Sequence, residues 1–211
     1  MGLPEGSRPC PSCGQPLFGW LQIDTPAGPS LLERCENCRL GIAAELQPTD
    51  VSRELLAEAR NTAGGELELR LANRDSIQSR LGGVNWAALE PGRGLYLTQT
   101  SLRRLAEKAG LSLLGVDYER WGRSQIWMWQ TIVNAFTFNQ NFAIKARAGV
   151  MQPSGFGERL KYVIDAIVTV LAAPLVVAVS VPLELVAALT GRGGVFVASA
   201  AQSDEYENVD Q

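Results

Sequence analysis

All four cysteines of the chain fall into two pairs with two residues inside each pair, Cys10/Cys13 and Cys35/Cys38. Two intervening residues let a tight turn direct both thiolates at one ion, and two such turns complete a tetrahedral set of ligands. The 21 residues between the pairs slightly exceed the usual number for a four-cysteine zinc site of this form. The spacing predicts a structural zinc ion, because four protein ligands leave no coordination position open for a substrate.

Two disulfides or free thiols, and a redox-active pair, are the alternatives for these cysteines. The N-terminus lacks the charged start and apolar core of a signal peptide, so we expect a cytoplasmic location, where disulfides are rare. A redox pair normally opens a helix after a strand, a context that neither pair has. We therefore predict a zinc ribbon with strands near residues 20–24 and 31–35, and with Gly14 and Gly41 at positive φ in its turns.

The composition excludes several classes of chemistry. The chain has no histidine, which removes the commonest general base and the Ser-His and Cys-His nucleophile pairs. Its net charge is −3, with 19 Lys and Arg against 22 Asp and Glu, and the basic residues form no stripe. We therefore expect no nucleic-acid partner.

A second group of polar residues follows a predicted strand. Residues 66–72 alternate leucine with charged side chains, and Asn73, Asp75 and Ser76 come directly after them. Open α/β sheets bind ligands at the carboxyl ends of their strands. The same residue types also form turns by hydrogen-bonding nearby backbone groups. The turn is the simpler interpretation, because the sequence shows no opposite wall for a ligand.

The elements around these motifs are predicted in the order helix, strand, loop, helix, strand, as in α/β proteins. Residues 51–60 form an amphipathic pattern. A second helix can be capped by Thr98, Thr100 or Ser101, and its apolar positions recur at helical spacing. A strand over residues 111–118 follows.

Residues 64–118 resemble the second half of class I S-adenosylmethionine-dependent methyltransferases, in a subgroup that often carries an N-terminal zinc ribbon. The family pattern is a Gly-Gly turn, a strand ending in P-N-x-D-S, then R-x-x-G-x-x-W, P-R-H-L-Y-x-F-T, a helix ending in A-G, and another strand. The matching residues, in order, are Gly64, Gly65, Asn73, Asp75, Ser76, Arg80, Gly83, Trp86, Arg93, Leu95, Tyr96, Thr98, Ala109 and Gly110. Later segments up to residue 200 are also similar, and residues 193–200 resemble the family's last strand, which pairs in the same sheet as the strand at 66–72.

This resemblance implies a mixed α/β fold with a partial, Rossmann-like sheet. It also implies candidate substrate-pocket residues, which are Asn73, Asp75, Ser76, Trp86, Arg93 and Tyr96. The chain departs from the pattern at two places. Gly94 stands where the family has histidine, and Ala72 stands where the family has proline.

The family's cofactor lies against a glycine-rich loop after its first strand, and this chain has no room for that half of the fold. Only 25 residues separate Cys38 from Gly64, fewer than one strand–helix–strand unit requires. The Gly-x-Gly stretches at 92–94, 155–157 and 191–193 are typical of turns. We therefore predict that S-adenosylmethionine binding has been lost.

The predicted organisation begins with the zinc ribbon over residues 1–44 and a linker with a short helix over 45–62. A partial methyltransferase-like domain covers residues 63–202, and residues 203–211 form an acidic tail. An apolar helical segment is expected over residues 163–190, inside the methyltransferase-like domain.

Residues 166–183 contain 18 residues without a charge, which is the lower limit for a membrane span. Three interpretations remain open: a helix or helical hairpin that dips into the membrane, a true span, and a buried lid. Basic residues precede the segment and acidic ones follow it, so a span would place the N-terminal side in the cytoplasm. A span conflicts with the pairing expected for residues 193–200.

These observations favour a methyltransferase-like protein that has lost cofactor binding and acts as a membrane-associated accessory or interaction module. One alternative is an active methyltransferase whose cofactor half comes from a partner chain. Another is a zinc-binding membrane protein unrelated to methyl transfer. A partial sheet would leave an open edge, so we also expect a protein partner or a homo-oligomer.

Overall fold

The computed structural model describes residues 8–25, 28–57, 59–62, 66–90 and 93–202. The expected acidic tail at 203–211 and the Gly-Gly turn at 64–65 lie outside these residues. The chain forms two compact units. Unit 1 comprises Met1–Asp75, Pro91–Tyr118 and Val195–Gln211, and unit 2 comprises Ser76–Glu90 and Glu119–Gly194.

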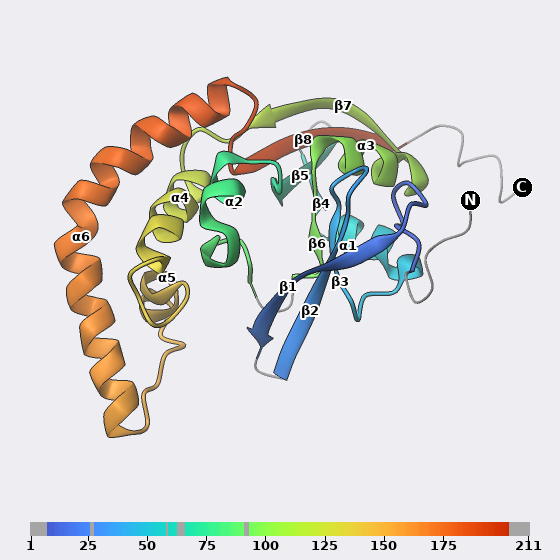
Figure 1. Cartoon of the computed structure of the whole chain (residues 1–211). Helices are drawn as coiled ribbons and strands as arrows, with labels where there is room; N and C mark the ends of the chain where they lie inside the picture. Colours follow the sequence, from blue (N-terminus) through green and yellow to red (C-terminus); the bar gives the residue numbers. More distant parts are fainter. Residues whose placement is uncertain (1–7, 26–27, 58, 63–65, 91–92, 203–211) are drawn as a thin grey trace, which may run out of the picture. The chain divides into compact units, whose positions relative to one another are not determined.

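The first sheet of unit 1 is antiparallel and has the strand order β1-β2-β3-β6 (Figure 1). Its strands are β1 (Leu17–Thr25), β2 (Gly28–Cys35), β3 (Gly41–Ala43) and β6 (Leu95–Tyr96). The strands predicted at 20–24 and 31–35 are confirmed within β1 and β2. The sheet also recruits β6, about 50 residues further along the chain than β3.

The second sheet of unit 1 is also antiparallel and has the order β4-β5-β8-β7. Its strands are β4 (Ala59–Asn61), β5 (Leu67–Ala72), β7 (Leu111–Tyr118) and β8 (Val195–Gln202). The predicted strands at 66–72 and 111–118 are therefore confirmed. β8 lies between β5 and β7, with Leu67 opposite Ala200. The strand predicted at 193–200 therefore pairs with the strand predicted at 66–72. The protein is a mixed α/β structure with two antiparallel sheets.

The helical elements of unit 1 are η1 (Pro48–Asp50), α1 (Val51–Ala57) and α3 (Gln99–Lys108). Thr98 caps α3, and its side chain and that of Ser101 each accept a hydrogen bond from the other residue's backbone N–H. Gly110, with φ of 73°, follows the end of α3. Both helices contribute to the hydrophobic core, for example through Leu55 and Leu102, which are fully buried.

Unit 2 is helical. It contains α2 (Ile77–Gly82), η2 (Gly83–Asn85), α4 (Arg123–Asn134), α5 (Phe142–Arg147) and α6 (Phe156–Leu189). The 34 residues of α6 extend over about 51 Å. α6 packs against α4 and α5 and is visibly curved (Figure 1). Pro174 and Pro182 lie inside it, and each lacks the N–H that would bond to the preceding turn, which favours bending.

Candidate metal centre and apolar groove

The four cysteines form one cluster, with all their sulfur atoms within 4.8 Å of one another. Cys10 Sγ lies 3.5 Å from Cys38 Sγ, and Cys13 Sγ lies 3.4 Å from Cys35 Sγ. Four sulfurs placed tetrahedrally at about 2.3 Å from zinc would lie about 3.8 Å apart. No disulfide joins the four cysteines. The cluster can therefore hold a metal ion such as zinc.

The turns that present the sulfurs are alike in the two pairs. Gly14 has φ of 76° and Arg39 has φ of 58°, and each directly follows the second cysteine of its pair. The prediction for Gly14 is confirmed, but the prediction of positive φ at Gly41 is wrong. Gly41 is instead constrained by packing: a Cβ there would lie 2.9 Å from the Trp20 ring and 3.1 Å from Tyr96 Cβ.

Hydrogen bonds adjust the acidity of the thiols. The hydrogen bond between Cys10 and Cys38 lowers the pKa of Cys38 to about 4 and raises the pKa of Cys10 above its usual range. Burial raises the pKa of Cys35. Backbone N–H groups of Ser12 and Cys13 hydrogen-bond to the Cys10 sulfur and favour its thiolate form. A metal ion bound by these four cysteines would displace the remaining thiol protons.

Helix α3 is tied to the cysteine loops near both of its ends. Thr98, its N-cap, donates from Oγ1 to the backbone oxygen of Cys38 at 2.9 Å. Lys108, its last residue, donates from Nζ to the backbone oxygen of Pro11. The cysteines themselves form part of the hydrophobic core of unit 1. The position of the cluster is therefore set by the folded unit as well as by the local turns.

The polar residues after β5 form a turn and a helix cap. Asn73 Oδ1 accepts a hydrogen bond from the backbone N–H of Asp75 at 2.9 Å. Ser76 Oγ accepts one from the backbone N–H of Ser79 at 3.0 Å and caps α2. The carboxylate of Asp75 forms an ion pair with Arg39 at 2.7 Å, in which both side chains are substantially exposed.

The other substrate-pocket candidates are distributed over both units. Tyr96 in β6 is buried, and its ring contacts the edge of Trp20 at a centroid distance of 6.2 Å. Arg93 precedes β6 and is partly buried. Trp86 is fully buried in unit 2, to which Ser76 also belongs. Asn73, Asp75, Arg93 and Tyr96 belong to unit 1.

Two buried acids on α6, Asp165 and Glu184, were not predicted as functional residues. In the sequence they are only the charged residues on either side of the uncharged segment 166–183. Asp165 accepts hydrogen bonds from the backbone N–H groups of Phe138 and Asn139 and from the Asn139 amide. Glu184 accepts from Gln78 Nε2, from Ser124 Oγ and from the backbone N–H of Gly194.

Both acids are fully shielded from solvent. Burial raises the pKa of Glu184, and its three hydrogen bonds oppose that shift. Their one signal in the sequence is chemical: a carboxylate in an otherwise apolar helix needs partners. The sequence does not indicate which residues provide them.

The outward side of α6 is strongly apolar. The most hydrophobic 18-residue window of the helix is only 11% buried. The exposed large side chains along its middle are Val163, Ile167, Val170, Leu171, Leu175, Val177 and Val179. The helix therefore has an inner side that carries the two hydrogen-bonded acids and an outer side of uncovered aliphatic groups.

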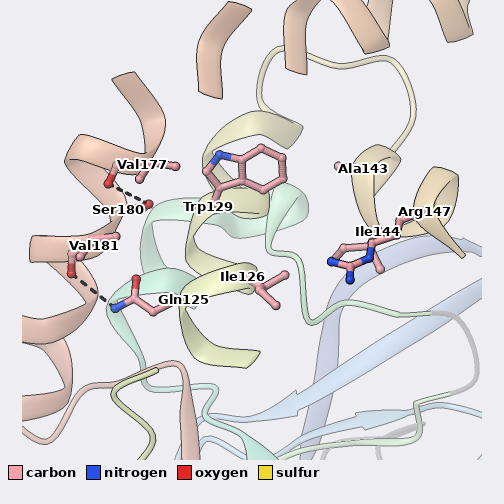
Figure 2. Close-up of a pocket in the computed structure, with 9 residues that line it drawn as sticks. All are labelled: Gln125, Ile126, Trp129, Ala143, Ile144, Arg147, Val177, Ser180 and Val181. Atoms are coloured by element: carbon pink, nitrogen blue, oxygen red, sulfur yellow. Dashed lines mark hydrogen bonds between the residues drawn. The ribbon is translucent and has the colours of Figure 1, made fainter. Parts of the chain in front are cut away.

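A groove of about 400 Å³ opens on the helices of unit 2 (Figure 2). Each of three helices contributes three residues: Gln125, Ile126 and Trp129 from α4; Ala143, Ile144 and Arg147 from α5; and Val177, Ser180 and Val181 from α6. The lining is almost entirely apolar, and none of the six substrate-pocket candidates contributes to it.

Comparisons with protein-family models, with curated proteins and with solved structures find no match for this chain. The resemblance to methyltransferases therefore rests only on the matching residues and on their order along the sequence. The structural features that bear on function are the cysteine cluster, the long helix and the groove.

Proposed function

We propose that this protein is a zinc-containing, membrane-associated accessory module derived from an S-adenosylmethionine-dependent methyltransferase whose cofactor-binding half it lacks. The observation that carries the proposal is the uncovered apolar side of α6, described above. Monomeric soluble proteins rarely leave a contiguous apolar patch of this kind in water. A lipid surface on the cytoplasmic side of a membrane would cover it.

The chain path supports a helix that lies on or dips into the membrane over one that crosses it. β7 and β8 pair directly, with Asp117 opposite Val197. The chain therefore leaves the second sheet after β7 and returns to it at β8. The only membrane-length helix among the described residues between them is α6, because α4 has 12 residues and a crossing needs about 20. A single crossing would place the two paired strands on opposite sides.

The cysteine cluster supports zinc as the resident metal. Its four sulfur ligands, their near-tetrahedral spacing and the absence of an open coordination position are typical of structural zinc. Cys10, Cys13, Cys35 and Cys38 would hold the ion and join β2 to the N-terminal loop.

One feature supports descent from a methyltransferase, and a second is consistent with loss of the cofactor-binding half. β8 lies in the same sheet as β5 and next to it, which is the pairing that the resemblance implies. Between β3 and β5, the described residues form only η1, α1 and β4. Those elements supply no strand followed by a glycine-rich loop and a helix, so they offer no place for the family's cofactor.

An accessory role also involves a protein partner, for which β7 is the best-supported contact. β7 has a hydrogen-bonded neighbour on one side only among the described strands, and Leu114 on it is exposed. An edge of this kind can accept a strand from another chain or from a second copy. Size-exclusion chromatography with mass measurement in the absence of detergent tests the self-association, and a clean monomer would leave only a different chain as partner.

Vesicle flotation tests the membrane assignment. The double variant Leu171→Asn/Leu175→Asn removes two of the most exposed leucines of α6, at 76% and 72% exposure. Each buried leucine contributes about 1.5–3 kcal/mol, so binding to phosphatidylglycerol vesicles should fall by at least tenfold. Leu81→Asn is the matched control, because Leu81 is an exposed leucine on α2. Unchanged flotation of the double variant would contradict the proposal.

Calorimetric titration of the zinc-loaded protein with S-adenosylmethionine and with its demethylated product tests the loss of cofactor binding. We expect no binding heat at millimolar ligand. Binding at micromolar concentration would instead support an active methyltransferase. Transfer of a labelled methyl group in the presence of a partner chain would then identify the acceptor.

A further inference from the structure

The residues that line the groove between α4, α5 and α6 recur at helical spacing on each of the three helices. On α4 the lining positions are i, i+1 and i+4, on α5 they follow the same spacing, and on α6 they are i, i+3 and i+4. Residues at these spacings share one face of a helix. Three helices therefore each turn one face to the same cavity, and in Figure 2 the α4 residues lie between those of α5 and α6.

Polar atoms in this groove lack partners. Trp129 Nε1, a donor, and Gln125 Oε1, an acceptor, are both shielded from solvent and have no hydrogen-bond partner in the described part of the chain. Gln125 donates from its amide nitrogen to the backbone oxygens of Arg120 and Val181, and its amide oxygen has no donor among the described residues. Unpaired buried polar atoms of this kind are unusual in folded proteins. Because both atoms are already covered by protein atoms beside the open groove, the surface that an occupant meets is almost entirely apolar.

A single positive charge lies at the groove. Arg147, the last residue of α5, is exposed, and no carboxylate among the described residues pairs with it. A guanidinium favours carboxylate and phosphate groups, to which it can donate two parallel hydrogen bonds. The cavity volume of about 400 Å³ lies at the lower end for small-molecule sites, and so favours a single-chain ligand.

We propose that this groove binds a monoacyl phospholipid with an anionic headgroup, of the lysophosphatidate type. Its acyl chain lies along Ile126, Ile144 and Val177, and its phosphate pairs with Arg147. The inference rests on the proposed membrane association for the source of the lipid, but Val177 is the one groove residue that also belongs to the exposed aliphatic set of α6 named above.

Trp129 provides the readout. Lauroyl lysophosphatidate brominated on its chain, used below its micellar concentration, should quench part of the protein's tryptophan fluorescence, because bromine quenches indole on contact. In the variant Trp129→Phe, which removes one of five tryptophans, most of that quenching should disappear. Quenching that persists unchanged in Trp129→Phe would overturn the proposal.

Substitutions separate the groove from the general apolar surface. Ile126→Asp places a charge in the groove at a half-exposed position and should abolish lysophosphatidate binding while leaving vesicle flotation intact. Val170→Asp, on α6 outside the groove, should weaken flotation and leave lysophosphatidate binding within twofold. The reverse pattern, or an equal loss of lysophosphatidate binding in both variants, would overturn the groove assignment.

Two substitutions on α5 test the role of the Arg147 charge. Arg147→Gln should weaken lysophosphatidate binding about tenfold through a faster dissociation rate, and Lys145→Gln, which removes the same charge from α5 outside the groove, should leave it unchanged. Lysophosphatidylcholine of the same chain length, whose headgroup has no net charge, should bind wild type about tenfold more weakly. Equal binding of the brominated fatty acid would overturn the phospholipid identity, since that probe carries a carboxylate in place of the phosphate.

Discussion

The two units keep ionisable groups in their interiors by opposite means. In unit 1, Cys10, Cys35 and Cys38 lie in the core with Cys13 packed against it, and the four thiolates that a metal ion would bind need that cation from outside the chain. In unit 2, Asp165 and Glu184 are equally buried, but three donors of the chain itself surround each of them. If the cluster holds a metal as proposed, the stability of unit 1 depends on metal supply, whereas that of unit 2 depends on hydrogen bonds that form with the fold.

The largest effect that separates the units is expected from loss of the metal. Cys38→Ser removes one of four ligands and should release the zinc, which in small zinc domains contributes about 10–16 kcal/mol to folding. Hydrogen exchange should become fast in β1 to β3 and α3, and remain slow in α4 and α6. Zinc content by mass spectrometry accompanies the measurement. Slow exchange throughout a metal-free protein would show that unit 1 does not depend on the ion.

A second expected effect is confined to unit 2. Glu184→Ala leaves Gln78, Ser124 and the Gly194 N–H without their acceptor, and should lower the free energy of unfolding of unit 2 by about 3–5 kcal/mol. Glu158→Ala is the control, since Glu158 lies exposed near the start of the same helix. Zinc affinity should be the same in both variants. A loss of zinc affinity in Glu184→Ala would mean that the two units do not respond independently.

The free energy of unfolding of unit 2 should also depend on pH, through Glu184. Burial raises the pKa of Glu184 in the folded protein, so the folded state holds the proton more tightly than the unfolded state does. The stability contributed by this group is therefore fully present below its unfolded pKa and is lost as pH rises through the folded pKa. In chemical denaturation between about pH 5 and about pH 8, wild type should gain stability relative to Glu184→Gln as pH falls. A constant difference would contradict the shift.

The smallest expected effects come from the two helix caps, one in each unit. Thr98→Ala and Ser76→Ala each remove a side-chain acceptor at a helix N-terminus and should each lower stability by about 1 kcal/mol. Thr98 also holds the Cys38 carbonyl, so only its variant should weaken zinc binding. Competition with a colorimetric chelator measures that difference, and equal zinc affinities in the two variants would remove α3 from the support of the cluster.

Local patterns in the sequence predicted the elements whose determinants are close together. The alternating leucines identified β5, and the Thr98 cap with its apolar repeat identified α3. The cysteine cluster could be predicted for the same reason, because a pair of ligands two residues apart needs only one turn.

Features that depend on distant residues were not predicted. Glu184 takes its hydrogen bonds from Gln78, 106 positions away, and from Ser124, 60 positions away. The groove draws its lining from three helices, and no single helical pattern marks Arg147 or Trp129 as neighbours. The wrong prediction at Gly41 has the same origin, because the Trp20 ring and the Tyr96 Cβ that require a glycine come from other strands.

The central position of β8 has a consequence for synthesis on the ribosome. β5 and β7 cannot complete their sheet until β8 arrives, and α6 precedes β8 in the chain. The nascent protein therefore exposes both a sheet without its middle strand and a long apolar helix during translation. Engagement of α6 by a lipid surface or by a chaperone at that stage would cover its apolar side until the last strand is made.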